Sequence, residues 1–117
     1  MTVLCYLQDI PRFGAKEFQI MSSGQQLDIF VIRSNHNVYG YKNICPHQGL
    51  TLNWLPDLFL NHDQSLIQCS NHAALFRIED GVCISGPCAG ERLIPVTIKL
   101  DNGIVTLVDE SMHIQTN

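Results

Sequence analysis

Two short pairs of cysteine and histidine constrain this chain more than any other feature of its sequence. Cys45 and His47 are separated by one residue, and Cys69 and His72 by two. Each pair therefore sets one thiol and one imidazole in a tight turn, and two such turns can together surround one metal ion or a cluster of two. A set of two cysteines and two histidines favours zinc or an iron–sulfur centre.

The order and the unequal spacing of these residues resemble the Rieske [2Fe–2S] family, in which two cysteines hold one iron and two histidines the other. Gly49 follows the first pair as in the family's C-x-H-x-G motif, and Phe76 follows the second pair at the family's phenylalanine. The Asp80-Gly81 turn and the Gly86-Pro87 loop also have counterparts there. The matching positions run from about residue 27 to 108, which is most of the chain.

The resemblance implies that Cys45, His47, Cys69 and His72 bind one [2Fe–2S] cluster, and it assigns no catalytic residue. It also implies an electron carrier and not an enzyme, similar to the ferredoxins of multicomponent dioxygenases. In those systems a flavoprotein reductase supplies the electron, and a terminal oxygenase or another redox enzyme receives it. Two features depart from the family: 21 residues (48–68) separate the two pairs, which suggests an inserted loop, and Ala73 replaces the usual glycine.

Three cysteines remain outside the two pairs: Cys5, Cys83 and Cys88. Respiratory members of the family carry a further cysteine in each ligand loop, and the two form a disulfide. Leu50 and Asn71 stand at the equivalent positions here, so the resemblance points to the ferredoxin-like branch. Cys83 and Cys88 are close enough in sequence to pair, and two partly buried thiols are the alternative in a reducing compartment.

The same resemblance sets an expectation for the reduction potential. Rieske clusters have potentials of roughly −150 to +300 mV, and hydrogen bonds to sulfur raise the value. Respiratory members have a serine just after the second pair and a tyrosine in the loop that covers the cluster. This chain has Ala74 after the second pair and Cys88 in the loop. We therefore expect a potential near the low end of the range.

Short runs of alternating, β-branched and aromatic residues predict strands throughout the chain. Polar turns with glycine, asparagine or aspartate separate these runs. With the resemblance, they predict a single all-β domain over residues 1–117, a Rieske-like antiparallel β sandwich or barrel with a small cluster-binding subdomain of two ligand loops. The expected strands are residues 3–7, 17–21, 27–33, 38–41, 66–69, 75–78, 82–84, 96–100 and 104–108.

The segment 50–63 is rich in large apolar side chains, including Trp54, Leu58 and Phe59, and we expect a loop with at most one helical turn. One interpretation is an apolar surface beside the cluster at which a redox partner docks. The alternative is that these side chains fold inward over the core.

Composition excludes several classes of function. A net charge of −4 argues against a nucleic-acid partner, which would require a basic surface. No apolar run approaches the ~18 residues that a membrane-spanning helix needs. The N-terminus shows no signal peptide, so the cytoplasm is the expected location. His36, His62 and His113 are scattered, and 117 residues leave no room for the second iron domain of a large Rieske oxygenase.

Two other functions fit parts of the pattern. The small subunit of assimilatory nitrite reductase also resembles this domain, although many such subunits have lost the ligands. A structural zinc module for protein binding is possible for a set of two cysteines and two histidines. Iron with equimolar sulfide would exclude the zinc module, and co-purification with a large sirohaem enzyme would favour the reductase subunit.

Overall fold

A computed structural model describes residues 2–22, 24–44, 46, 52–53, 57, 59–70 and 74–108. Its described part is built from antiparallel strands and one short 3-10 helix, η1 (Leu7–Asp9). The strands are β1 (Thr2–Tyr6), β2 (Phe13–Ser22), β3 (Gln25–Ser34), β4 (Asn37–Lys42), β5 (Leu66–Gln68), β6 (Leu75–Arg77), β7 (Cys83–Ser85), β8 (Pro95–Val96), β9 (Ile98–Asp101) and β10 (Ile104–Leu107). The predicted all-β antiparallel fold is confirmed. The described residues contain no helix of the length and apolar character that crossing a membrane requires.

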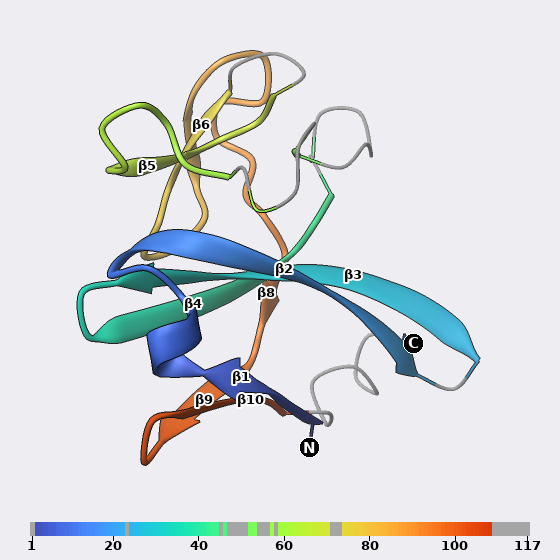
Figure 1. Cartoon of the computed structure of the whole chain (residues 1–117). Helices are drawn as coiled ribbons and strands as arrows, with labels where there is room; N and C mark the ends of the chain where they lie inside the picture. Colours follow the sequence, from blue (N-terminus) through green and yellow to red (C-terminus); the bar gives the residue numbers. More distant parts are fainter. Residues whose placement is uncertain are drawn as a thin grey trace.

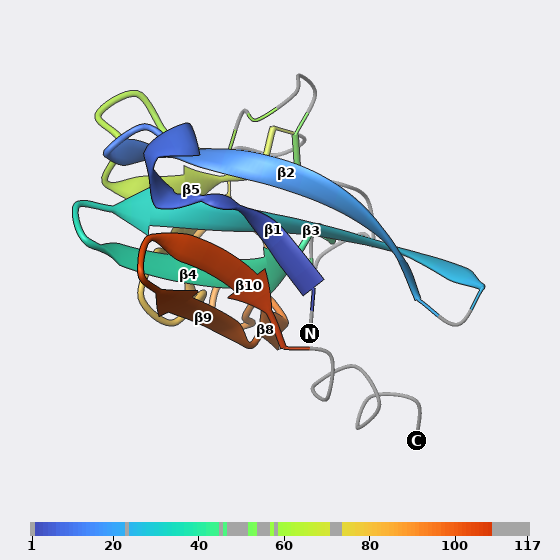
Figure 2. The same ribbon diagram turned by 60° about the horizontal axis from the view of Figure 1, so that its bottom comes forward.

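The strands form three sheets in layers. A central sheet has the order β2-β3-β4-β8, a second has the order β1-β10-β9, and a third has the order β5-β6-β7. Figure 1 shows β5 and β6 on one side of β2, β3 and β4, and β1, β9 and β10 on the other. The view in Figure 2 brings β1, β10 and β9 forward across the central sheet.

The strand β3 explains this layering because both of its faces are buried. Side chains alternate along a strand, so Phe30 and Ile32 pack into the core beneath the third sheet, while Ile29 and Val31 pack toward the second sheet. All four are fully buried. A run of β-branched and aromatic residues favours such a two-sided strand.

Most predicted strands match the structure to within two residues at each end, but two differ more. The run 17–21 lies within the longer β2, because β2 pairs with β3 from Phe13↔Ser34 to Ser22↔Gln25 and this pairing carries the strand beyond its apolar residues. The run 96–100 divides into β8 and β9, because Val96 pairs with Gly40 of the central sheet whereas Ile98 pairs with Leu107 of the second.

The third sheet is fixed to the central sheet by buried contacts. The hydroxyl of Tyr41 in β4 donates a hydrogen bond to the carbonyl oxygen of Ile78, just beyond β6, over 2.6 Å. Burial, helped by the carboxylates of Asp80 and Glu79, raises the pKa of Tyr41, so the hydroxyl keeps its proton for this bond. A buried hydrogen bond therefore ties the end of the third sheet to the central sheet.

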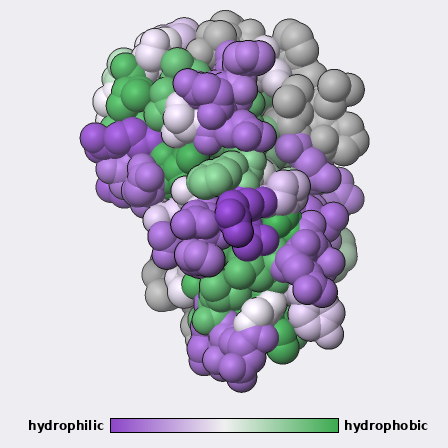
Figure 3. All heavy atoms as spheres, turned by 60° about the vertical axis from the view of Figure 1, so that its left-hand side comes forward, coloured by the Kyte–Doolittle hydropathy of each residue, from purple (hydrophilic) through white to green (hydrophobic). Residues whose placement is uncertain are grey.

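Two apolar residues of the segment 50–63 fold inward. Leu52 and Phe59 are buried in the same core as Phe30, and the rings of Phe30 and Phe59 stack with centroids 4.2 Å apart. The inward interpretation is thus confirmed for Phe59, whereas Trp54 and Leu58 lie outside the described residues. On the face that Figure 3 shows, hydrophobic areas are interrupted by hydrophilic side chains.

Candidate metal centre

The four candidate ligands follow strands of two different sheets. Cys69 comes directly after β5, which ends one residue earlier than the expected strand 66–69, and its side chain is 0% exposed. Cys45, His47 and His72 lie outside the described residues. Since β4 ends at Lys42, two residues separate it from Cys45.

The second pair lies in the connection between two neighbouring strands. Gln68 of β5 pairs with Leu75 of β6, and the Cys69 N–H donates to the Ala74 carbonyl oxygen at 2.9 Å. This bond continues the β5–β6 pairing by one step, so Cys69 and Ala74 lie opposite one another at the end of the two strands. A rigid hairpin end of this kind fixes the position of a ligand before any metal binds.

Asn43 closes the segment that contains the first pair. This side chain is only 3% exposed, and its backbone N–H donates to the Asp28 carbonyl oxygen at 2.8 Å. Its side-chain oxygen accepts from the Leu52 N–H at 2.8 Å, and its amide nitrogen donates to the Asn53 side-chain oxygen at 2.9 Å. Residues 43 and 52 flank the first pair, so these bonds join the two ends of its loop.

Glu17 in β2 holds the same junction from the central sheet. One of its carboxylate oxygens accepts from the Asn53 side chain at 2.7 Å and from the Asp57 N–H at 3.0 Å. The Glu17 N–H donates in return to the Asp57 carboxylate at 2.8 Å. The polar network of Glu17, Asn43, Asn53 and Asp57 therefore ties the loop of the first pair to the central sheet.

Leu52 connects the segments of the two pairs. Its N–H is bonded to Asn43, and its carbonyl oxygen accepts from the Ser70 N–H at 2.7 Å. Ser70 follows Cys69 directly, while Leu52 lies five residues after His47. A single peptide segment is therefore hydrogen-bonded to both ligand loops, which brings two sequence-distant segments together at one end of the third sheet.

Sequence reasoning missed this network. The available signal was an asparagine directly after a strand, a residue type that often bonds to nearby backbone groups. Nothing in the sequence showed that its partners would be Leu52 and Asn53, or that Glu17 would join them.

The Gly86-Pro87 loop packs against the second ligand loop. Gly86 has φ of +109°, and a Cβ at this position would lie 2.9 Å from the Ala74 Cα. Both the backbone conformation and the close approach require glycine here. The loop thus lies next to the residue that ends the second ligand loop.

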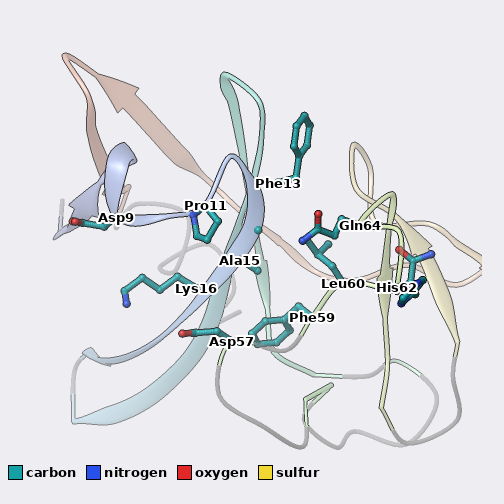
Figure 4. Close-up of a pocket in the computed structure, with 12 residues that line it drawn as sticks. Asp9, Pro11, Phe13, Ala15, Lys16, Asp57, Phe59, Leu60, His62 and Gln64 are labelled. Atoms are coloured by element: carbon teal, nitrogen blue, oxygen red, sulfur yellow. The ribbon is translucent and has the colours of Figure 1, made fainter.

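A shallow groove lies elsewhere, between the start of β2 and the loop before β5. Its volume is ≈ 640 Å³, and its described lining contains none of the four candidate ligands. Figure 4 shows Asp9, Lys16 and Asp57 on one side of it and His62 on the other. These titratable side chains are spread along the groove and do not surround a common point.

Comparisons with known proteins agree with this arrangement. A family model described as the Rieske [2Fe-2S] domain matches residues 1–106. The chain belongs to the Rieske [2Fe–2S] domain family. Its cofactor is accordingly one [2Fe–2S] cluster. The family assignment favours the iron–sulfur centre over the structural zinc site.

Solved structures share the Rieske fold at low sequence identity. The ferredoxin of carbazole 1,9a-dioxygenase from Nocardioides aromaticivorans IC177 is 21% identical, with a TM-score of 0.71 over 92% of this chain and 98% of that one. A chain from a complex of reduced oxygenase and oxidised ferredoxin of carbazole 1,9a-dioxygenase is 20% identical, with a TM-score of 0.70 over 92% and 91%. No curated protein sequence matches the chain.

The terminal oxygenase of carbazole 1,9a-dioxygenase from Novosphingobium sp. KA1 contains the same fold. It is 18% identical, with a TM-score of 0.73, and the match covers 92% of this chain but 28% of the oxygenase. The chain therefore corresponds to about a quarter of that larger protein.

The residues of this chain fit a [2Fe–2S] cluster. The candidate donors are two thiols and two imidazoles, the set that such a cluster takes in this family. The thiol of Cys69 is buried, and the Cys69 N–H is bonded to the Ala74 carbonyl oxygen. Leu52 is bonded both to Asn43, before the first pair, and to Ser70, next to Cys69.

Proposed function

We propose that this protein is an electron carrier whose [2Fe–2S] cluster is held by Cys45, His47, Cys69 and His72. The observation that carries the ligand assignment is the pair of hydrogen bonds at Leu52, one to Asn43 beside the first pair and one to Ser70 beside the second. Because the two loops share this connection, their thiols and imidazoles can act on one cofactor.

Each ligand has a defined role in this proposal. Cys45 and Cys69 bind one iron as thiolates, and His47 and His72 bind the other as neutral imidazoles. The bound cluster supplies the capacity to accept and release one electron. The polar network and the β5–β6 pairing hold the described residues that flank the ligand loops, which favours little reorganisation on a change of charge.

We propose a flavoprotein reductase as the electron donor and a terminal oxygenase, or another redox enzyme, as the acceptor. Support comes from the fold shared with the ferredoxins of carbazole dioxygenase, some of which are solved in complexes with their oxygenase.

Visible absorption and low-temperature EPR of anaerobically purified protein, before and after dithionite, test the cluster assignment. We expect a red-brown oxidised form that bleaches on reduction and gives a rhombic signal with a low average g value. Iron and sulfide should be equimolar. A colourless, EPR-silent protein with stoichiometric zinc would contradict the proposal.

Substitution of the ligands tests their identity. Cys69→Ser and His72→Ala should lose the rhombic signal and most of the bound iron. Cys5→Ser and His62→Ala are the matched controls, because both residue types are removed far from the ligand loops, and these variants should keep the full signal. A normal Rieske spectrum in Cys69→Ser would remove that residue from the ligand set.

Protein-film voltammetry tests the expected potential. Ala74 has no hydroxyl to donate to a cluster sulfur, and a thiol replaces the family's tyrosine at Cys88. We expect a one-electron wave near the low end of the range of roughly −150 to +300 mV. A value well above about +100 mV, within that same range, would contradict this expectation.

The donor can be tested with the flavoprotein reductase of a carbazole dioxygenase system. Oxidised protein, mixed anaerobically with that reductase and NADH, should bleach within the time of a stopped-flow experiment. Protein that dithionite bleaches but that this reductase and NADH leave oxidised would retain the cluster assignment and contradict this class of donor.

A further inference from the structure

Two thiols outside the ligand set lie side by side next to the second ligand loop. The Sγ atoms of Cys83 in β7 and Cys88 in the following loop are 3.0 Å apart. Their side chains are 2% and 0% exposed. A disulfide requires a sulfur–sulfur distance of about 2.05 Å, so a shift of about 1 Å would suffice to join them.

The backbone already holds these two residues at the base of one loop. The Gly90 N–H donates to the Cys83 carbonyl oxygen at 3.0 Å, and the Glu91 N–H donates to that of Cys88 at 2.9 Å. The Cys83 N–H in turn donates to the Glu91 carbonyl oxygen at 2.7 Å. A disulfide would therefore join two residues that backbone hydrogen bonds already hold close together.

We propose that Cys83 and Cys88 are a second redox site, a reversible dithiol–disulfide pair that responds to the disulfide of a small thiol such as oxidised glutathione. One cysteine thiolate attacks a sulfur of oxidised glutathione, forms a mixed disulfide and releases one glutathione. The second cysteine thiolate then attacks the protein sulfur of this mixed disulfide and releases the other glutathione. Two electrons and two protons pass from the pair to glutathione, and one protein disulfide replaces one glutathione disulfide.

The loop gives a reagent a route to the buried sulfurs. Residues 84–87 and 89–92 are exposed on both sides of Cys88. A Cβ at Gly90 would meet no atom within 4 Å, so this side of the loop is not packed. Cys88 lies in this loop, so opening of the loop would uncover its thiol, which makes the first attack, while Cys83 stays in β7 beside it.

The location of the pair links it to the cluster, and this step rests on the proposed ligand role of Cys69. Gly86, between the two cysteines, packs on Ala74, and the Ala74 carbonyl oxygen accepts the Cys69 N–H. A disulfide would hold the loop closed over the second ligand loop. We therefore expect the oxidised pair to slow the loss of the cluster.

The chemical step is tested on the holoprotein by anaerobic equilibration in mixtures of reduced and oxidised glutathione. Acid quenching, alkylation and peptide mass analysis then report each cysteine. We expect a disulfide mapped to Cys83 and Cys88, with loss of two hydrogen atoms, that returns to two alkylated thiols in excess reduced glutathione. The absorption of the cluster should persist throughout.

Three results would overturn the proposal. They are two alkylatable thiols at Cys83 and Cys88 even in oxidised glutathione alone, a stable mixed disulfide without closure, and a bond mapped instead to Cys5 between two chains. This measurement reports only the peptides that contain these cysteines. Its result therefore does not depend on whether the proposed ligands hold the cluster. The measurement uses the wild-type protein, so it does not depend on the folding of any variant.

The effect on the cluster is tested by the rate at which an iron chelator bleaches the cluster absorption. This rate is compared between protein with the Cys83–Cys88 disulfide and protein with the two free thiol groups. We expect bleaching to be several-fold slower in the disulfide form. Cys88→Ala, with Cys88→Ser as a second variant, should bleach at one rate in both glutathione mixtures, and Cys5→Ser should behave as wild type. Equal rates in the two wild-type forms would overturn the link to the cluster and leave the disulfide measurement standing.

Discussion

The side-chain oxygen of Asn43 accepts the backbone N–H of Leu52 at 2.8 Å, across the loop that contains the first cysteine–histidine pair. In Asn43→Ala the buried Leu52 N–H would lose its partner. A buried donor left unpaired costs about 1–3 kcal/mol, so the free energy of unfolding should fall by about that amount. Urea unfolding followed by circular dichroism measures it. Because the loop is released, the cluster should also be lost faster to a chelator.

Asn61→Ala is the matched control for this variant. The Asn61 side chain accepts from the backbone N–H groups of Ser65 and Leu66 and so closes a turn before β5, away from the first pair. Its removal should lower stability without changing the EPR g values. Asn43→Ala should broaden or shift them, and indistinguishable spectra in the two variants would contradict a positioning role for Asn43.

Gly86→Ala should weaken the contact between the covering loop and the second ligand loop. The new Cβ would lie 2.9 Å from the Ala74 Cα, and the residue would keep φ of +109°, which non-glycine residues rarely adopt. We expect a loss of stability of about 2 kcal/mol or more, since the strain alone is worth about 1–3 kcal/mol. Thermal unfolding and the rate of cluster loss report it.

The variant Gly90→Ala separates the effect of backbone strain from the effect of the contact with Ala74. Gly90 has φ of +94°, but a Cβ there would meet no atom within 4 Å. This variant should show the backbone strain without the contact. If both variants lose cluster at the same rate, the packing of Gly86 on Ala74 is not what holds the second ligand loop.

The fold was largely predictable because its signals are local. The apolar run that became β3 is dense in β-branched and aromatic residues, and the two ligand pairs lie within four residues each. The division of the run 96–100 was not predictable, because the choice between two sheets depends on partners elsewhere in the chain. For the same reason the role of Glu17 was not predictable, since its hydrogen bonds to Asn53 and Asp57 span 36 and 40 residues.

Tyr41→Phe should loosen the attachment of the third sheet. It removes the donor to the Ile78 carbonyl oxygen and leaves that group buried without its 2.6 Å partner. The expected cost is about 1–3 kcal/mol in the free energy of unfolding, with no change in the slope of the urea curve. Tyr39→Phe, which removes a hydroxyl from the same strand at a partly buried position, is the control. An equal loss in both variants would mean that the hydrogen bond to Ile78 does not itself raise the free energy of unfolding.

Asp80→Asn should remove part of the dependence of stability on pH. The Arg77 guanidinium donates to both Asp80 carboxylate oxygens, at 3.1 and 2.6 Å, and the Val82 N–H donates to one of them at 3.0 Å. The Arg77 hydrogen bonds, and then that of Val82, hold the pKa of Asp80 below its ordinary value. A carboxylate with a lowered folded-state pKa stabilises the protein above its unfolded-state pKa, and this contribution disappears as pH falls through the folded-state pKa.

The wild type should therefore exceed Asp80→Asn in stability at neutral pH, and the difference should shrink as pH falls from about 5 through the ordinary aspartate pKa of about 3.9 and below it. Urea midpoints at several pH values measure it. Because the pair is exposed, the difference should also diminish in high salt. Asp63→Asn, at another carboxylate whose pKa is lowered by hydrogen bonds, those from Ser65, tests whether the effect is general to such turns. A difference between wild type and Asp80→Asn that stays constant over this pH range would show that the charge of Asp80 does not stabilise the fold.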